Sequence, residues 1–426
     1  MQEHPSSAED DFAVAHREWL RERVAHYLGR PVPDTARLDE EGLDSVAALS
    51  LYGDMEDEFG TLVEPEDIRA YPTVRELADF LAMRDSRHGA GRIRAAFVFT
   101  GQGSQHPGMT AGLHRHSTGY RTFLEEADAA LLPFTRQSVA GLILDDDPSV
   151  HRTALAQPAL FAVGYALART LQEAGVQPVA VLGHGIGEFA AATVAGALTL
   201  DDAARLVATR GALMQALPAG GAMMAACVTP YEAAELVAAE PDVGISAVNA
   251  AKSVVLSGDR AALERVEARL AERDVRCRYL TVTHAFHSPL MRPMVSEFEA
   301  CLRRLPGAAA RLPFYSTLYG RLATEPLYGP YWAEQITSPV RFADAARCLL
   351  AQQAPTHVVE IGPRPVLTPY LRRIGGGRRG PVCLPVCRGP RSDAVDLAGV
   401  ISALDAGPLT AAFPGVRGSG ARDGGA

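Results

Sequence analysis

The sequence is poor in cysteine and lacks any long apolar run. Six cysteines in 426 residues do not form the disulfide framework of a small secreted domain. Cys383 and Cys387 are four residues apart, but no second pair of cysteines or histidines follows them, so we expect no metal site. No apolar run approaches the roughly 20 residues that cross a bilayer. The acidic start also lacks the order of a secretory signal, which favours a cytoplasmic protein without a membrane partner.

Positive charge is scarce near the start of the chain. Residues 1–90 hold 21 acidic and 9 basic side chains, whereas the remainder holds 29 and 32. No stretch has the basic footprint of a nucleic-acid-binding protein, so we expect no nucleic-acid partner. An acidic head on a mildly basic body suggests two units with different partners. We expect four segments: a small domain at 1–84, a linker at 85–94, a large domain at 95–390 and a low-complexity tail at 391–426.

The acidic head has the pattern of a small helical bundle. Apolar residues recur at near-helical spacing over residues 11–28, 49–59 and 72–81. Short amphipathic stretches of this kind predict a four-helix bundle. Asp44 and Ser45 stand where the second stretch begins. Both residue types cap helices by accepting hydrogen bonds from free N–H groups, which is one explanation for their presence.

A second explanation for Ser45 comes from its surroundings. The segment Gly42-Leu-Asp-Ser-Val-Ala-Ala-Leu49, followed by an acidic helix, resembles the attachment site of acyl carrier proteins. The resemblance implies that Ser45 carries 4′-phosphopantetheine, installed by a phosphopantetheinyl transferase. A serine in the first turn of a helix is exposed, and its phosphodiester lies near the positive end of the helix dipole. The polar, glycine-containing linker at 85–94 predicts a flexible tether.

The large body alternates strand and helix patterns. Short runs at 95–99, 179–182 and 357–362 predict buried strands of a mostly parallel α/β sheet. Between residues 218 and 282 the predicted order is β-α-β-β-α-β, which indicates an inserted ferredoxin-like subdomain. A cleft between such an insert and a larger sheet is a common place for a site.

One of these strands leads into an incomplete catalytic motif. Residues 181–188 read Val-Leu-Gly-His-Gly-Ile-Gly-Glu, close to the G-x-S-x-G nucleophile elbow of α/β-hydrolase-like folds. In that elbow a strand turns sharply into a helix and presents a serine hydroxyl. Gly183 and Gly187 keep the frame, but Gly185 occupies the serine position. The frame predicts acyl transfer, whereas the missing hydroxyl removes the nucleophile.

Further motifs stand in a fixed order around this elbow. They include Thr-Gly-Gln-Gly-Ser-Gln at 100–105, Ala-Thr-Arg-Gly at 208–211 and Thr-His-Ala-Phe-His at 283–287. Residues 95–375 therefore resemble the malonyl-CoA:acyl-carrier-protein transacylases, including polyketide synthase acyltransferase domains. The resemblance implies malonyl transfer from malonyl-CoA, or transfer from another acyl-CoA, to its own or a separate acyl carrier protein. The pathway would be polyketide or fatty-acid biosynthesis, with a ketosynthase as a further candidate partner.

The resemblance also implies roles for individual residues. His287 matches the general base, and the backbone carbonyl of Gln335 matches the group that orients its imidazole. On the residues alone, a single histidine in this setting is more often a loop or core residue. The backbone N–H groups of Gln102 and Ile186 match the oxyanion hole, which needs no particular side chain. A neutral imidazole suits proton removal from a nucleophile and proton return to the leaving thiol.

Substrate contacts are implied in the same way. Arg210 matches the clamp on the malonyl carboxylate, which a planar guanidinium suits, although without context it would pass for a surface helix arginine. Gln157, Asn249 and His184 match positions that line the pocket. Phe286 belongs to the His-Ala-Phe-His pattern that accompanies malonyl substrates. Its ring would crowd an α-methyl group, a discrimination of about 1 to 3 kcal/mol.

Gly185 leaves several explanations open. The chain is an engineered serine knock-out, a natural pseudo-enzyme that serves as carrier and docking platform, an enzyme with a weak or altered reaction, or the product of a sequence error. An altered reaction could use a water activated by His287, giving a thioester hydrolase, or direct attack by the carrier thiol. Ser288 and Thr283 flank the base but do not lie on the elbow, so we do not expect them to replace the nucleophile. The fold should survive, since glycine relieves the strain of the elbow.

Overall fold

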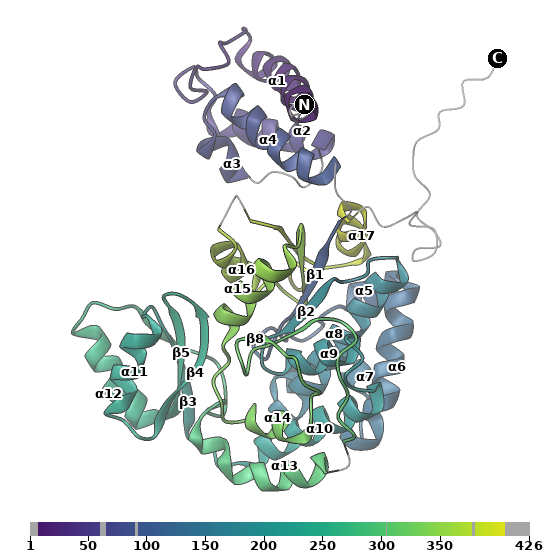
Figure 1. The fold of residues 1–426 in the computed structure, drawn as a ribbon, viewed down its shortest axis with the longest axis vertical. Coiled ribbons are helices and arrows are strands. Elements are labelled where there is room, and N and C mark those ends of the chain that lie inside the picture. The colour runs from purple at the N-terminus through teal and green to yellow at the C-terminus, as the bar shows by residue number, and fades with distance from the viewer. Residues whose placement is uncertain (1–6, 60–64, 90–92, 304, 377–379, 405–426) are drawn as a thin grey trace, which may run out of the picture. The chain divides into compact units, whose positions relative to one another are not determined.

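The computed structural model divides the chain into two compact units, Met1–Ile93 and Arg94–Ala426, each of which is described by itself (Figure 1). None of the helices described is both long and apolar enough to span a membrane. The structure describes residues 7–59, 65–89, 93–303, 305–376 and 380–404.

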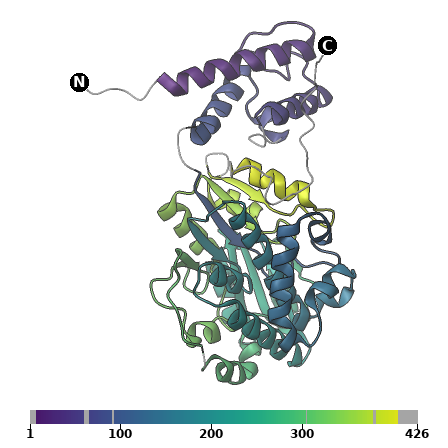
Figure 2. The same ribbon diagram turned by 90° about the vertical axis from the view of Figure 1, so that its right-hand side faces the viewer.

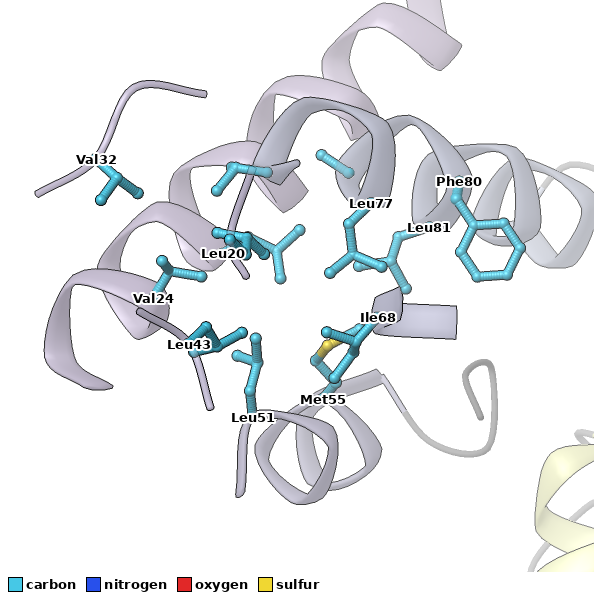
Figure 3. Packing of buried hydrophobic residues seen from close by; sticks show 13 residues of the cluster. Leu20, Val24, Val32, Leu43, Leu51, Met55, Ile68, Leu77, Phe80 and Leu81 are labelled. Carbon is cyan, nitrogen blue, oxygen red and sulfur yellow. The ribbon is translucent and has the colours of Figure 1, made fainter. Parts of the chain in front are cut away.

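The first unit is helical. Its core consists of apolar side chains that recur every three or four residues, among them Leu20, Leu51 and Leu77, which are fully buried (Figure 3). Burying each such leucine stabilises the unit by about 1.5 to 3 kcal/mol. Its helices are α1 (Ser7–Leu28), α2 (Ser45–Phe59), α3 (Pro65–Ala70) and α4 (Val74–Gly89).

The predicted linker at 85–94 begins too early. Helix α4 continues to Gly89, so the first half of that segment is helical. Arginine, aspartate and serine are tolerated in an exposed helix at a cost of a few tenths of a kcal/mol each, roughly, so their polarity does not end one. Residues 90–92 lie outside the described part of the chain.

The second unit is built on a mixed sheet with the strand order β10-β9-β1-β2-β7-β8. All neighbouring pairs are parallel except β7 with β8, so the predicted parallel α/β sheet is confirmed. The central strands are buried on both faces, which explains their continuous apolar sequences. The strands are β1 (Ala95–Phe99), β2 (Ala180–Gly183), β7 (Phe314–Ser316), β8 (Arg321–Leu322), β9 (His357–Ile361) and β10 (Val382–Pro385).

Helices cover both sides of this sheet. In Figure 2, α6 and α8 (blue) lie on one side of the strands, and α15 and α16 (yellow-green) lie on the other. Helix α8 packs against α6, α9 and α10 and is buried over most of its length. The helices are α5 (Ala111–His116), α6 (Thr118–Thr135), α7 (Val139–Leu144), η1 (Pro148–His151), α8 (Thr153–Glu173), α9 (Gly187–Val194), α10 (Leu200–Ala216), η2 (Pro289–Met294), α13 (Val295–Leu302), α14 (Gly329–Glu334), α15 (Phe342–Gln353), α16 (Thr368–Ile374) and α17 (Ala394–Ala403).

The predicted tail at 391–426 also begins too early, because α17 is folded. Asp393 and Asp396 form a capping box at its start. Leu397 and Ile401, one helical turn apart, are buried. This local pattern outweighs the glycine-rich composition further on. Residues 405–426 lie outside the described residues.

A second sheet is inserted between α10 and η2. Its four strands are antiparallel in the order β4-β5-β3-β6, and α11 and α12 cover one face (Figure 1). A parallel bridge between Ala247 and Val340 ties it to the segment before α15. Its elements are β3 (Gly221–Ala226), α11 (Pro230–Ala238), β4 (Val243–Ala250), β5 (Ser253–Asp259), α12 (Arg260–Ala271) and β6 (Cys277–Tyr279).

Candidate active site

The turn between β2 and α9 is tight enough to require glycine at two positions. A Cβ at Gly183 would overlap the backbone of Glu188, and one at Gly187 would lie 2.6 Å from the carbonyl oxygen of Phe99. Contacts this short do not occur at real Cβ atoms, so both glycines are fixed by packing. Between them Gly185 has a φ of +55°, in the left-handed region. The segment therefore has the backbone of a nucleophile elbow.

Gly185 faces the imidazole of His287. A Cβ at Gly185 would have a single neighbour within 4 Å in the described part of the chain, the Nε2 atom of His287 at 3.4 Å. A side chain at this position would therefore point to that ring nitrogen without meeting another group.

The tautomer of His287 follows from its partners. Its Nδ1 lies 3.0 Å from the carbonyl oxygen of Gln335 and 3.0 Å from that of Ser338. Carbonyl oxygens only accept, so Nδ1 carries the proton and Nε2 presents its lone pair toward Gly185. Burial, followed by the nearby charge of Arg210, lowers the pKa of His287 to about 3. The ring is therefore neutral near pH 7.

Two backbone N–H groups near the elbow are free. Within the described ranges, neither the N–H of Gln102 nor that of Ile186 has an acceptor. The loop that carries Gln102 packs on the elbow, because a Cβ at Gly101 would lie 2.5 Å from the carbonyl oxygen of His184. Free, preorganised N–H groups of this kind can stabilise an oxyanion.

Arg210 brings a buried positive charge to the same region. Its side chain is only 2% exposed, and Nη1 donates to Oε1 of Gln157 at 2.9 Å. Among the described residues its Nε has no hydrogen-bond partner, and the nearby charge of Glu188 favours its charged form. Burial lowers the pKa of Arg210 to about 10, so the guanidinium stays charged at pH 7. Nε2 of Gln157 donates in turn to Oε1 of Gln102 at 3.3 Å, which links the guanidinium to the Gln102 loop.

Two other predicted pocket residues contact each other. The Nε2 atom of His184, on the elbow, lies 2.9 Å from Oδ1 of Asn249, on β4. Burial lowers the pKa of His184. Phe286 is buried directly before His287 in the chain. The hydrogen bond between His184 and Asn249 therefore ties the inserted subdomain to the elbow.

The hydroxyl groups next to the base are used locally. Ser288 Oγ donates to the carbonyl oxygen of Ala285 at 2.6 Å and accepts from the N–H of Leu290. Thr283 Oγ1 lies 2.8 Å from Nδ1 of His284. Neither hydroxyl lies within 4 Å of a Cβ at Gly185.

Two features of the site have no clear mark in the sequence. The carbonyl of Ser338 is a second acceptor for His287, and main-chain acceptors have no side-chain signature. Glu188, which ends the elbow motif, is fully buried and bound by residues more than 120 positions away. Its place beside the motif is the signal that could have identified it.

The first unit presents the segment around Ser45 at the start of α2. Oδ1 of Asp44 accepts from the N–H of Ala47 at 2.8 Å, so Asp44 supplies the helix cap without Ser45. The backbone of Ser45 opens the helix, and its side chain lies outside what the structure describes. Asp44 is exposed, and so is Leu49 one turn later, at 60%. This end of α2 therefore leaves room for an attached group.

Comparison with known proteins assigns both units. Residues 96–381 match the acyl transferase domain family, and residues 18–81 match the phosphopantetheine attachment site family. Polyketide synthase GfsB of Streptomyces halstedii is 38% identical over 331 residues, which are 75% of this chain and 6% of that protein. Phenolphthiocerol synthesis polyketide synthase type I Pks15/1 of Mycobacterium marinum is 41% identical over 307 residues, 68% of this chain and 14% of that protein. The chain thus spans a small part of these curated relatives.

Solved structures agree with this assignment. The acyltransferase domain from the second module of the salinomycin polyketide synthase matches with a TM-score of 0.70 and 38% identity, covering 77% of this chain and 79% of that one. The malonyl-CoA:acyl carrier protein transacylase of Xanthomonas oryzae matches with a TM-score of 0.66 and 32% identity, covering 73% and 98%. The chain therefore belongs to the acyl transferase domain family found in polyketide synthases, and it carries a phosphopantetheine attachment domain ahead of that domain.

Proposed function

We propose that the second unit binds a malonyl thioester in the manner of its family but lacks the attacking hydroxyl. Arg210 binds the free carboxylate of the malonyl group, and the N–H groups of Gln102 and Ile186 bind the thioester oxygen. The observation that carries this proposal is the 3.4 Å distance between a Cβ at Gly185 and Nε2 of His287. A serine at that position would place its hydroxyl within reach of a neutral base.

Without that hydroxyl, the elbow forms no acyl-enzyme. Removing the nucleophile of a triad-type enzyme lowers kcat by roughly 10⁶-fold and leaves the contribution of binding and the oxyanion hole. Malonyl transfer to a carrier by the native chain is therefore strongly impaired. The α/β-hydrolase-like elbow and the ferredoxin-like insert would then serve mainly to bind the thioester and to dock partners.

The first unit supplies the carrier in this proposal. Ser45 would hold 4′-phosphopantetheine, installed by a phosphopantetheinyl transferase. The start of α2 fits this group, because Asp44 already caps the helix and is itself exposed. The thiol of the arm would carry the acyl group, and a ketosynthase would be the partner that takes it. Phe286 beside the base favours malonyl over methylmalonyl substrates.

Hydrolysis is a second candidate, favoured by the free space that Gly185 leaves next to Nε2 of His287. A water there would lose a proton to Nε2 while its oxygen attacks the thioester carbon. The carbon–sulfur bond then breaks, and the proton moves from His287 to the leaving thiolate, giving malonate and free thiol. Triad enzymes that lack their nucleophile still accelerate hydrolysis about 10³ to 10⁴-fold over the uncatalysed reaction in water. We expect thioester hydrolysis by the native chain to be accelerated by a similar factor.

Incubation of the phosphopantetheinylated chain with radiolabelled malonyl-CoA tests these functions. The native chain and its Gly185→Ser variant are compared, with and without His287→Ala. Label on the carrier arm only with Gly185→Ser supports the proposed site, and label that persists with His287→Ala contradicts it. Free malonate from the native chain supports hydrolysis. Malonyl-CoA that binds but does not react with the native chain supports a carrier and docking platform.

A further inference from the structure

Glu188 lies in the first turn of α9, three residues after Gly185, and its carboxylate is fully buried. Oε1 accepts from the N–H and from Oγ1 of Thr317 at 2.5 and 2.8 Å. Oε2 accepts from the Tyr331 hydroxyl at 2.7 Å and from Nε2 of Gln335. All four partners are donors, so the arrangement suits the ionised carboxylate, although burial raises the pKa of Glu188.

Gln335 connects this carboxylate to the base. One hydrogen of its Nε2 is donated to Glu188, and the other is donated to the carbonyl oxygen of Gly185 at 3.2 Å. Its Oε1 has no partner among the described residues, so these two acceptors alone set the direction of the amide. The main-chain carbonyl of the same residue accepts from Nδ1 of His287 at 3.0 Å. A single residue thus separates the carboxylate from the imidazole.

From this geometry we propose that Glu188 is a positioning residue, which holds Gln335 so that its carbonyl, together with that of Ser338, orients the His287 ring with Nε2 toward position 185. Glu188 makes no contact with the reacting atoms. It acts through Gln335, and it also fixes the elbow carbonyl through the same amide. The proposal extends the proposed function, on which the kinetic part of its test rests.

A purely structural role makes a different prediction. Glu188 also ties α9 to β7 and α14 through Thr317 and Tyr331. If that were its whole role, substitution would lower stability without changing the imidazole. Glu188→Gln tests the positioning role against the purely structural one. The amide keeps the size of the side chain, but its NH₂ group faces a group that donated to the carboxylate and can no longer be bound in the same way.

Glu360 offers a matched control. It is also a buried glutamate, at the end of β9, and its carboxylate accepts from the N–H groups of Val366, Leu367 and Thr368 and from Oγ1 of Thr368. None of these partners contacts His287. Glu360→Gln should therefore cost stability of the same kind while leaving the imidazole unchanged.

The first measurement is the nitrogen spectrum of ¹⁵N-histidine in the native full-length chain, which needs no activity. Because the carbonyl of Ser338 also accepts from Nδ1, we expect the Nδ1–H tautomer of His287 in every chain, with a shifted Nδ1 resonance in Glu188→Gln but not in Glu360→Gln. If Glu188→Gln does not fold, Gln335→Met replaces it, since it removes the amide but keeps the carbonyl. An unchanged Nδ1 resonance of His287 in the folded variant that is used would overturn the proposal.

The second measurement uses the Gly185→Ser variant with Ser45→Ala, so that position 185 is the acceptor. Release of CoA in a single turnover gives the acylation rate and the half-saturating malonyl-CoA concentration. Adding Glu188→Gln should lower the acylation rate at saturating malonyl-CoA about 10 to 100-fold, as misplacement of a base does. Equal rates with Glu188→Gln and Glu360→Gln would contradict the positioning role. If Gly185→Ser itself does not acylate, the proposed function fails, while the nitrogen spectrum still tests Glu188.

Discussion

The guanidinium of Arg210 donates to the side-chain carbonyl of Gln157 at 2.9 Å, and its Nε has no partner among the described residues. A buried cation with an unused donor is costly unless an anion arrives. We therefore expect Arg210→Ala to weaken malonyl-CoA binding to the native chain about 10 to 100-fold, because a hydrogen bond to a charged group contributes roughly 1.5 to 3 kcal/mol. Calorimetric titration measures this directly. Arg347→Ala, which removes an exposed ion pair with Asp344, is the control. Equal affinities of the Arg210→Ala variant and the native chain for malonyl-CoA would contradict the proposal that Arg210 binds the malonyl carboxylate.

The rate of acylation in the Gly185→Ser variant is expected to fall only at unusually low pH. Acylation of Gly185→Ser requires the neutral form of His287, and burial lowers the pKa of this ring to about 3. A lowered pKa keeps the base neutral as pH falls below its ordinary value of about 6.5, so the rate should stay constant from about pH 8 to about pH 5. Single-turnover rates over this range test the expectation. A loss of activity centred near pH 6.5 would show that the imidazole titrates normally.

Restoring the hydroxyl should cost stability. The backbone at Gly185 has a φ of +55°, which a residue with a Cβ adopts at a cost of about 1 to 2 kcal/mol. Gly185→Ser is therefore expected to have a free energy of unfolding lower by that amount, measured by urea denaturation of the second unit's transition. The Cβ itself meets only a 3.4 Å contact, so packing adds little. A variant that is more stable than the native chain would refute this account of the elbow.

The neighbouring glycines should behave differently. A Cβ at Gly187 would lie 2.6 and 2.7 Å from the carbonyl oxygens of Phe99 and Thr100, which are backbone atoms that cannot move aside cheaply. Gly187→Ala is expected to destabilise the fold by about 1 to 3 kcal/mol, the usual cost of forcing atoms into a packed core, and more than Gly185→Ala does. The same urea titration compares the two. Equal losses of unfolding free energy in the two variants would mean that the turn between β2 and α9 shifts to make room for the added Cβ.

Phe286 should determine the size of the acyl group. It is buried directly before His287 in the chain, and under the proposed function its ring would crowd an α-methyl group. In the Gly185→Ser background, Phe286→Ser should reduce the preference for malonyl-CoA over methylmalonyl-CoA by about 10 to 200-fold. Competition between the two substrates measures the ratio. An unchanged ratio would place selectivity elsewhere in the pocket.

Much of the larger sheet was predictable from the sequence, because β1, β2 and β9 are buried on both faces and therefore have apolar sequences. The elbow frame at Gly183 and Gly187 was equally visible, since packing allows only glycine there. Arg210 and His287 stand in motifs whose residue types suit the chemistry. These residues lie far apart in the chain. From the sequence, only the resemblance to a known family indicates that they belong to one site.

Other features could not be predicted because they depend on main-chain atoms or on distant partners. The carbonyl of Ser338 reaches His287 from 51 positions away, and any residue type could supply it. The donors to Glu188 come from Thr317 and Tyr331, at separations of 129 and 143 positions. The polar end of α4 and the short α17 were misplaced because composition alone does not mark where a helix ends.

The most direct test is the mass of the chain after incubation with malonyl-CoA, with Ser45→Ala present so that the carrier arm cannot contribute. The account predicts that Gly185→Ser gains one malonyl group at position 185 and that the chain with Gly185 gains none. A malonyl adduct on the chain with Gly185, or no adduct on the Gly185→Ser variant, would contradict it.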